Sequence, residues 1–182
     1  MNDDLIAPFP AGSVILISGI MGAGKSTVAQ LLAERLPRSA HIRGDAFRRL
    51  IVSGRSEMVP SADAEAIAQL QLRYRLAAMV ADGYAEAGFT AVYQDIVLGD
   101  DLVQASARIR TRPLFIVVLA PSADAALRRS ERRDKPSGYG DWTLEELDAM
   151  LRRTPRIGLW IDTSEQSAQE TVEEIWRSAR PV

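Results

Sequence analysis

The stretch Val14-Ile-Leu-Ile-Ser-Gly-Ile-Met-Gly-Ala-Gly-Lys-Ser26 decides the fold class of this chain. Its first four residues form a continuous apolar run, which is typical of a strand buried on both faces of a sheet. The residues from Gly19 to Ser26 match the pattern G-x-x-x-x-G-K-[ST] of a phosphate-binding loop. A helical apolar face follows at Val28, Leu31, Leu32 and Leu36. Strand, glycine-rich loop and helix in this order predict an α/β domain that binds a nucleotide.

Apolar runs alternate with helical patterns along the rest of the chain. Further strands are expected at residues 40–43, 90–97, 114–119 and 157–161. Helices are expected at 46–51, 61–87 and 100–109, from Ser122 onward, and after the capping boxes that begin at Thr143 and Ser167. This alternation predicts a doubly wound five-stranded parallel sheet with helices on both faces.

Composition limits the class of protein. The length of 182 residues suits one domain, which we expect to span residues 1–182. The 22 basic and 24 acidic side chains nearly balance, which argues against a nucleic-acid partner or an acidic membrane surface. The chain has no cysteine and one histidine, His41, so thiolate chemistry is excluded and a Ser-His-Asp triad is disfavoured. Because the start is acidic and no apolar run reaches the length of a membrane span, we expect a cytoplasmic protein.

The phosphate loop has a clear chemical role. Its glycines let successive backbone N–H groups surround phosphate oxygens, and the helix that follows points its positive dipole end at the same anion. Lys25 is expected to reach the β- and γ-phosphates, and the Ser26 hydroxyl to bind Mg²⁺. The expected nucleotide-binding residues are Gly19, Met21, Gly22, Ala23, Gly24, Lys25, Ser26 and Thr27.

Two lysines and one missing glutamate narrow the class of nucleotide-binding protein. Lys25 belongs to the phosphate loop and Lys135 follows Asp134, so no lysine is left for the N-K-x-D guanine motif of a GTPase. A transporter or motor ATPase would carry an acidic residue just after the aspartate at the end of the third strand, but Ile96 follows Asp95. The pattern therefore favours phosphoryl transfer to a bound acceptor over hydrolysis that drives motion.

With these motifs, the chain resembles small P-loop kinases and phosphotransferases of the nucleoside-kinase-like superfamily. It is most similar to chloramphenicol-phosphotransferase-like proteins, with adenylylsulfate kinase and gluconate kinase as relatives. The resemblance covers nearly the whole chain, and outside the phosphate loop it is carried by Gly44-Asp45 with Arg48, Asp95, an arginine-rich segment at 122–142, and Leu159-Trp-Ile-Asp-Thr163. It implies an ATP- and Mg²⁺-dependent enzyme that phosphorylates a hydroxyl of an antibiotic, nucleoside, sugar or related small molecule. It also implies that the loop at Asp162-Thr163 packs against adenine.

Two aspartates are candidates for the acceptor side of the reaction. We expect Asp45 at the carboxyl end of the second strand, beside the strand that carries the phosphate loop, where it could act as general base. The alternative is that Asp45 caps the helix from Ala46. Asp95 could hold Mg²⁺ through water or bind the substrate hydroxyl, or it could serve only in structural hydrogen bonds. A carboxylate at the end of an apolar strand needs a cation or donors.

The remaining candidate residues lie in two segments. In the acceptor-binding region, residues 45–62, Phe47 and Arg48 are expected to contact substrate, whereas Arg49 could equally lie on a solvated helix face. In the lid, residues 122–142, Arg128 and Arg132 share a helix face and could neutralise charge on the transferred phosphoryl group. Arg133 and Lys135 are weaker lid candidates. The long helix is expected to pack four of its side chains into the hydrophobic core of the protein: Tyr74, Leu76, Met79 and Val80.

Two other functions also fit the sequence. One is a regulatory module that binds a nucleotide without phosphorylating any acceptor. The other is a kinase that acts on a polynucleotide or a nucleotide sugar, although the slight negative charge weakens the polynucleotide case.

Overall fold

One five-stranded parallel sheet forms the centre of the molecule within residues 8–131 and 142–182, the residues that this computed structural model describes. Its strand order is β2-β3-β1-β4-β5. The bounds are β1 (Val14–Gly19), β2 (Ser39–Arg43), β3 (Thr90–Gln94), β4 (Leu114–Leu119) and β5 (Leu159–Ile161). All neighbouring strands pair in parallel, which confirms the expected doubly wound α/β fold.

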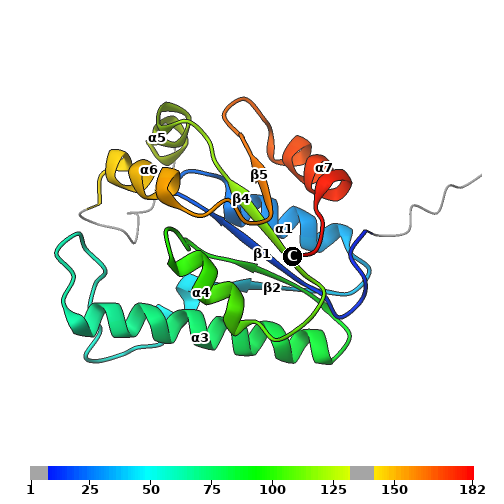
Figure 1. The fold of residues 1–182 in the computed structure, drawn as a ribbon, viewed down its shortest axis with the longest axis horizontal. Helices are drawn as coiled ribbons and strands as arrows, with labels where there is room; N and C mark the ends of the chain where they lie inside the picture. The colour runs from blue at the N-terminus through cyan, green and yellow to red at the C-terminus, as the bar shows by residue number, and fades with distance from the viewer. Residues whose placement is uncertain (1–7, 132–141) are drawn as a thin grey trace, which may run out of the picture.

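Helices cover both faces of the sheet (Figure 1). The helices are α1 (Lys25–Arg35), α2 (Gly44–Arg49), α3 (Ala64–Glu86), α4 (Asp101–Arg108), α5 (Ala123–Glu131), α6 (Leu144–Arg153) and α7 (Ala168–Ser178). Figure 1 shows α3 and α4 on one side of the sheet, α1 and α7 on the other, and α5 close to α6. Among the helices described, none combines the length and apolar character needed to cross a membrane.

The core is built around β1 and β4. All six residues of each strand are buried, as the apolar runs predict for strands covered on both faces. β1 lies at the centre of the sheet, with Leu16 opposite Tyr93 of β3 on one side and Ile116 of β4 on the other. The phosphate loop therefore leaves the middle of the carboxyl edge, where open α/β sheets bind their ligands.

The helix ends follow the capping rules. Thr143 caps α6 and Ser167 caps α7. In both capping boxes the side chain of the cap residue accepts a hydrogen bond from the backbone N–H of the glutamate three residues later, and the side chain of that glutamate accepts one from the backbone N–H of the cap residue. Asp63 caps α3 by accepting a 2.8 Å hydrogen bond from the backbone N–H of Ala66. The two capping boxes confirm the helix starts expected at Thr143 and Ser167, whereas α3 begins three residues later than expected.

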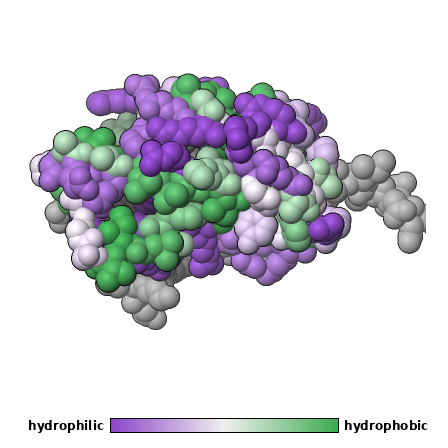
Figure 2. Space-filling model, turned by 90° about the horizontal axis from the view of Figure 1, so that it is seen from below, coloured by the Kyte–Doolittle hydropathy of each residue, from purple (hydrophilic) through white to green (hydrophobic). Residues whose placement is uncertain are grey.

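Several expectations are wrong. The fifth strand begins at Leu159 and not at residue 157, and α3 begins at Ala64 and not at residue 61. The third strand ends at Gln94 and not at residue 97, because the chain turns away from the sheet after Asp95. β2 is an edge strand, and β3 lies between it and β1, so Asp45 does not follow a strand that neighbours the phosphate loop. On α3, Met79 and Val80 are 61% and 36% exposed, because the helix buries its alanine face instead. Figure 2 views the molecule from below Figure 1, the side on which α3 lies, and shows apolar surface there.

Candidate functional site

The phosphate loop joins β1 to α1 and packs directly against α5. Gly22 adopts a φ of +77°, and a Cβ atom there would lie 2.2 Å from the carbonyl oxygen of Ala126 in α5. Gly24 adopts a φ of +91° as the residue before α1. Both positions require glycine, since side chains disfavour positive φ and the first site has no room for one. The loop thus brings the start of α1 and the backbone of α5 together.

Lys25 reaches back across this loop. It is the first residue of α1, and its Nζ donates a 2.8 Å hydrogen bond to the carbonyl oxygen of Ile20. The side chain is largely buried, so the ammonium group is held at the loop instead of extending into solvent. Ser26 and Thr27 occupy the next positions of the same helix turn, and the Thr27 backbone N–H donates a 3.1 Å hydrogen bond to the carbonyl oxygen of Gly24. This arrangement suits an anion.

Asp95 follows β3 and is held by a dense set of donors. Arg73 of α3 forms a two-point ion pair with it, in which Nε lies 2.8 Å from Oδ2 and Nη2 contacts Oδ1. The Tyr93 hydroxyl donates to Oδ2 and the Ile96 backbone N–H to Oδ1. The side chains of Arg73 and Asp95 are only 7% and 1% exposed. The structure thus shows the cation and donors that a buried carboxylate needs, and a role of Asp95 toward substrate or Mg²⁺ stays a prediction.

Asp45 lies on α2, the helix that follows β2. α2 begins at Gly44 with Arg43 as its cap residue, so Asp45 lies in the first helical turn and the interpretation of Asp45 as the helix cap is wrong. Its carboxylate accepts a 2.6 Å hydrogen bond from Arg49, and the two side chains are 48% and 60% exposed. Asp45 therefore remains accessible to a ligand, and its role as base stays a prediction.

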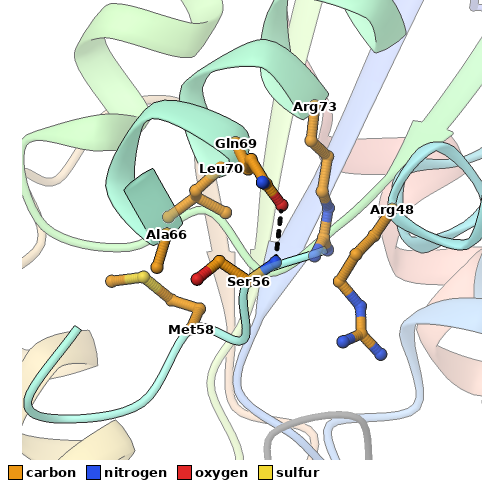
Figure 3. A pocket seen from close by; sticks show the side chains of 7 residues that line it. All are labelled: Arg48, Ser56, Met58, Ala66, Gln69, Leu70 and Arg73. Atoms are coloured by element: carbon orange, nitrogen blue, oxygen red, sulfur yellow. Dashed lines mark hydrogen bonds between the residues drawn. The ribbon is translucent and has the colours of Figure 1, made fainter. Parts of the chain in front are cut away.

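α2, the loop after it and α3 surround a small hollow (Figure 3). Its lining residues come from α2, the loop after it and the first turns of α3: Arg48, Ser56, Met58, Ala66, Gln69, Leu70 and Arg73. Phe47 instead packs against the core and is partly buried. Since Arg73 also binds Asp95, the inner end of the hollow lies at the carboxyl edge of the sheet.

The start of the expected lid packs on the phosphate loop. Arg128 lies on α5 and is exposed, two residues beyond the Ala126 carbonyl that faces Gly22. Arg132, Arg133 and Lys135 lie outside the described residues. Trp142, at the far end of the expected lid, donates from its indole N–H to the carbonyl oxygen of Met58 at 2.9 Å. One end of the segment 122–142 therefore contacts the phosphate loop, and the other contacts the loop between α2 and α3.

Arg129 links α5 to the loop between β5 and α7. Its Nη2 donates to the carbonyl oxygens of Thr163, Ser164 and Gln166 at 2.5, 3.2 and 3.1 Å. The Ser164 hydroxyl also accepts a 2.8 Å hydrogen bond from the Ser122 backbone N–H. These hydrogen bonds hold the backbone of the loop in place. The resemblance implies that this same loop packs against adenine.

Sequence reasoning missed the residues that hold the site together. Arg73 is one of two arginines in a helical segment, and only the need of Asp95 for a cation could have indicated it. Arg129 looked like any other arginine of an arginine-rich chain. No sequence pattern indicated Gln69 or Glu57, because their contacts depend on the path of the loop between α2 and α3.

No metal centre made of side chains is present among the residues described. A group of three or more His, Asp or Glu side chains placed to hold an ion does not occur in residues 8–131 or 142–182. The Ser26 hydroxyl at the start of α1 remains the candidate ligand for a cation that arrives with nucleotide phosphates.

The comparison with protein families decides the assignment. A family model described as "AAA domain" matches residues 14–157, which include the phosphate loop, both candidate aspartates and α5. The chain belongs to the AAA domain family. Membership of this P-loop family implies that the chain binds a nucleotide. No curated protein matches the chain in sequence.

Solved structures with the same fold include several P-loop kinases. A sugar kinase from Janibacter sp. HTCC2649 has a TM-score of 0.65 and 18% identity over 92% of this chain and 95% of its own. A gluconokinase from Sinorhizobium meliloti 1021 has a TM-score of 0.61 and 21% identity over 93% and 92%. The APS kinase of Mycobacterium tuberculosis, in complex with AMPPNP and APS, has a TM-score of 0.62 and 19% identity over 92% and 96%. At these identities the likeness shows that this AAA domain protein has a P-loop kinase fold.

Proposed function

We propose that the chain transfers the γ-phosphoryl group of ATP to a hydroxyl group of a small molecule. The observation that carries this proposal is the position of the hollow between α2 and α3. Its lining residue Arg48 lies on α2, as Asp45 does, and its inner residue Arg73 binds Asp95, the residue that follows the strand next to β1. A hydroxyl held there would lie at the same sheet edge as the phosphate loop. The kinase names of the structural neighbours agree with this reaction class.

Each residue of the proposed site has a separate task. The phosphate loop and Lys25 hold the β- and γ-phosphates, and Ser26 would hold Mg²⁺, which neutralises phosphate charge when bound. Asp45 accepts the proton of the acceptor hydroxyl as its oxygen bonds to the γ-phosphorus. The bond from that phosphorus to the bridging oxygen breaks, and ADP leaves. Arg128 and Arg132 stabilise the charge that develops on the transferred group.

The test combines a screen with two variants. Antibiotics, nucleosides, sugars and nucleotide sugars are offered with ATP, and both ADP formation and phosphorylated acceptor are measured. For the acceptor found, Asp45→Asn should lower kcat by about 10²–10⁴, the usual contribution of a general base. Lys25→Ala should abolish turnover and weaken ATP binding. Glu34→Gln, which removes an exposed carboxylate on α1, serves as the control.

Two outcomes contradict parts of this proposal. If no acceptor raises ADP formation and Asp45→Asn retains the biological activity, the chain is a regulatory module that binds nucleotide. If Lys25→Ala binds and turns over ATP like the wild type, the phosphate loop assignment is wrong.

A further inference from the structure

The first residue of α2 lies directly against the Asp95 carboxylate. β2 and β3 pair in parallel, with Arg43 opposite Gln94. The next residues along the two strands are Gly44, where α2 begins, and Asp95. A Cβ atom on Gly44 would lie 1.8 Å from Oδ2 of Asp95 and 2.4 Å from its Cγ. Both distances are far below van der Waals contact, so only glycine fits between the backbone of α2 and this carboxylate.

The conformation of the backbone does not explain this glycine. Gly44 begins a helix and does not have a positive φ angle, so any residue could adopt its backbone conformation. Within a helix, glycine is also a poorer choice than alanine, because it loses more conformational freedom on folding. Position 44 therefore requires glycine for space, and the Asp95 side chain sets that requirement.

Asp95 cannot readily move away from a side chain at position 44. Its carboxylate accepts hydrogen bonds from Nε of Arg73 at 2.8 Å, from the Tyr93 hydroxyl at 3.2 Å and from the Ile96 backbone N–H at 2.7 Å. The side chain is buried, so a movement that breaks these bonds would leave a charge without donors in the interior. An added methyl group would therefore displace the start of α2 instead of Asp95.

We propose that Gly44 is a positioning residue that seats α2 on the Asp95 carboxylate and thereby sets the place of Asp45. Asp45 is the next residue of the same helical turn, so a displacement of the start of α2 moves its carboxylate as well. This inference rests on the proposed function for the role of Asp45 as general base. Gly44 acts through Asp45 and takes no part in the proton transfer.

A kinetic comparison of glycine variants tests the effect on turnover. For the acceptor found by the screen, Gly44→Ala should lower kcat by about tenfold to 10²-fold, the cost of a misplacement of about 1 Å. The KM for ATP should stay within about twofold of wild type, because the phosphate loop follows β1 and β3 separates β1 from β2. Gly83→Ala is the matched control, since a Cβ atom at that helical position meets nothing within 4 Å.

A double variant tests whether Gly44 acts through Asp45. Residues that act as a unit have non-additive effects on kcat. In the Asp45→Asn background, Gly44→Ala should therefore change kcat by less than about twofold. A glycine that only supports the fold would lower kcat by the same factor in both backgrounds.

The steric cause is tested by thermal unfolding, which needs no acceptor. Gly44→Ala should lower the melting temperature of the wild type and keep its circular dichroism spectrum. In the Arg73→Met/Asp95→Ala background, only the Cβ atom of residue 95 remains, 3.0 Å from the added one. The same substitution should there leave the melting temperature unchanged or raise it. If Gly44→Ala does not fold by itself, it should fold again in this background.

Four results would overturn the inference. They are a kcat of Gly44→Ala within about twofold of wild type, an equal fold-loss in the Asp45→Asn background, an equal loss of melting temperature with and without the Asp95 carboxylate, and a Gly44→Ala chain that folds in neither background. Failure of the proposed function has a different signature. In that case the melting temperatures change as expected, but no acceptor is phosphorylated or Asp45→Asn retains the wild-type kcat.

Discussion

At the scale of single residues, each of the two candidate aspartates of the proposed acceptor site has an arginine partner. Asp95 is paired with Arg73 in the interior, and Asp45 with Arg49 at the surface. The two pairs differ in how much they contribute to the stability of the fold. An exposed pair contributes about 0–1 kcal/mol, whereas removal of one member of a buried pair leaves an uncompensated charge in the interior. The Arg73–Asp95 pair should therefore behave as a structural unit.

Removal of one partner of that unit should destabilise the fold more than removal of both. We expect Asp95→Asn to lower the free energy of unfolding by about 3–5 kcal/mol, because Arg73 then remains charged and buried. The double variant Arg73→Met/Asp95→Leu should recover a substantial part of that loss. Urea denaturation of the wild type, both single variants and the double variant measures the coupling. Equal losses in the single and double variants would show that the pair does not act as a unit.

At the scale of elements, α5 fixes two neighbouring loops. Its backbone at Ala126 contacts Gly22 of the phosphate loop, and Arg129 binds three carbonyl oxygens of the loop between β5 and α7. A guanidinium group that bonds several carbonyls in one loop restricts the backbone of that loop. α5 therefore joins the region proposed for phosphates to the region proposed for adenine.

Loss of Arg129 should weaken nucleotide binding more than acceptor binding. Without its donors, the carbonyl groups of residues 163–166 lose their fixed orientation, so Arg129→Ala should raise the KM for ATP by about tenfold, the equivalent of one charged hydrogen bond. The KM for the acceptor should stay close to the wild-type value. Arg177→Ala, on the exposed face of α7, is the matched control. An unchanged KM for ATP together with a lower melting temperature would make Arg129 purely structural.

At the scale of the whole molecule, Asp82 connects α3 to the segment between α4 and β4. It lies on α3 with only 2% of its surface exposed, and its carboxylate accepts hydrogen bonds from the backbone N–H groups of Arg110 and Thr111 and from the Thr111 hydroxyl. Burial by itself would raise the pKa of Asp82, but the donors of Thr111 and Arg110 outweigh it and hold the pKa below its ordinary value.

This lowered pKa makes the stability of the fold sensitive to acid. Asp82 has a lower pKa in the folded than in the unfolded chain, so its contribution is present at neutral pH and is lost as the pH falls below about 4. Asp82→Asn should lower the free energy of unfolding at pH 7 by about 1–3 kcal/mol, through unsatisfied buried donors. The difference from wild type should shrink toward pH 2. Thermal unfolding between pH 2 and 7 measures both effects.

The exposed Glu173→Gln serves as the control for this series, because Glu173 forms a surface pair with Arg35. It should change stability by less than about 0.5 kcal/mol at every pH. If Asp82→Asn had the same effect at pH 2 and pH 7, the ionised carboxylate would not be the stabilising group.

The sequence by itself determined the parallel sheet, the phosphate loop and most helix starts. These features depend on local patterns: the apolar run from Val14, the spacing of Gly19 and Lys25, and the capping residues Thr143 and Ser167. Backbone conformation and hydrogen bonding within a few residues specify them, so one sequence is enough to predict them.

Only the tertiary structure decided which charged side chains meet. Arg73 and Asp95 are 22 residues apart, and Arg129 lies 34 residues from Thr163. Among 20 arginines, the sequence offers no local signal that selects these two. The strand order, which places β3 between β1 and β2, brings Asp95 to the edge next to the phosphate loop. Such pairings depend on the packing of whole elements, and packing is a property of the complete chain and not of any short segment.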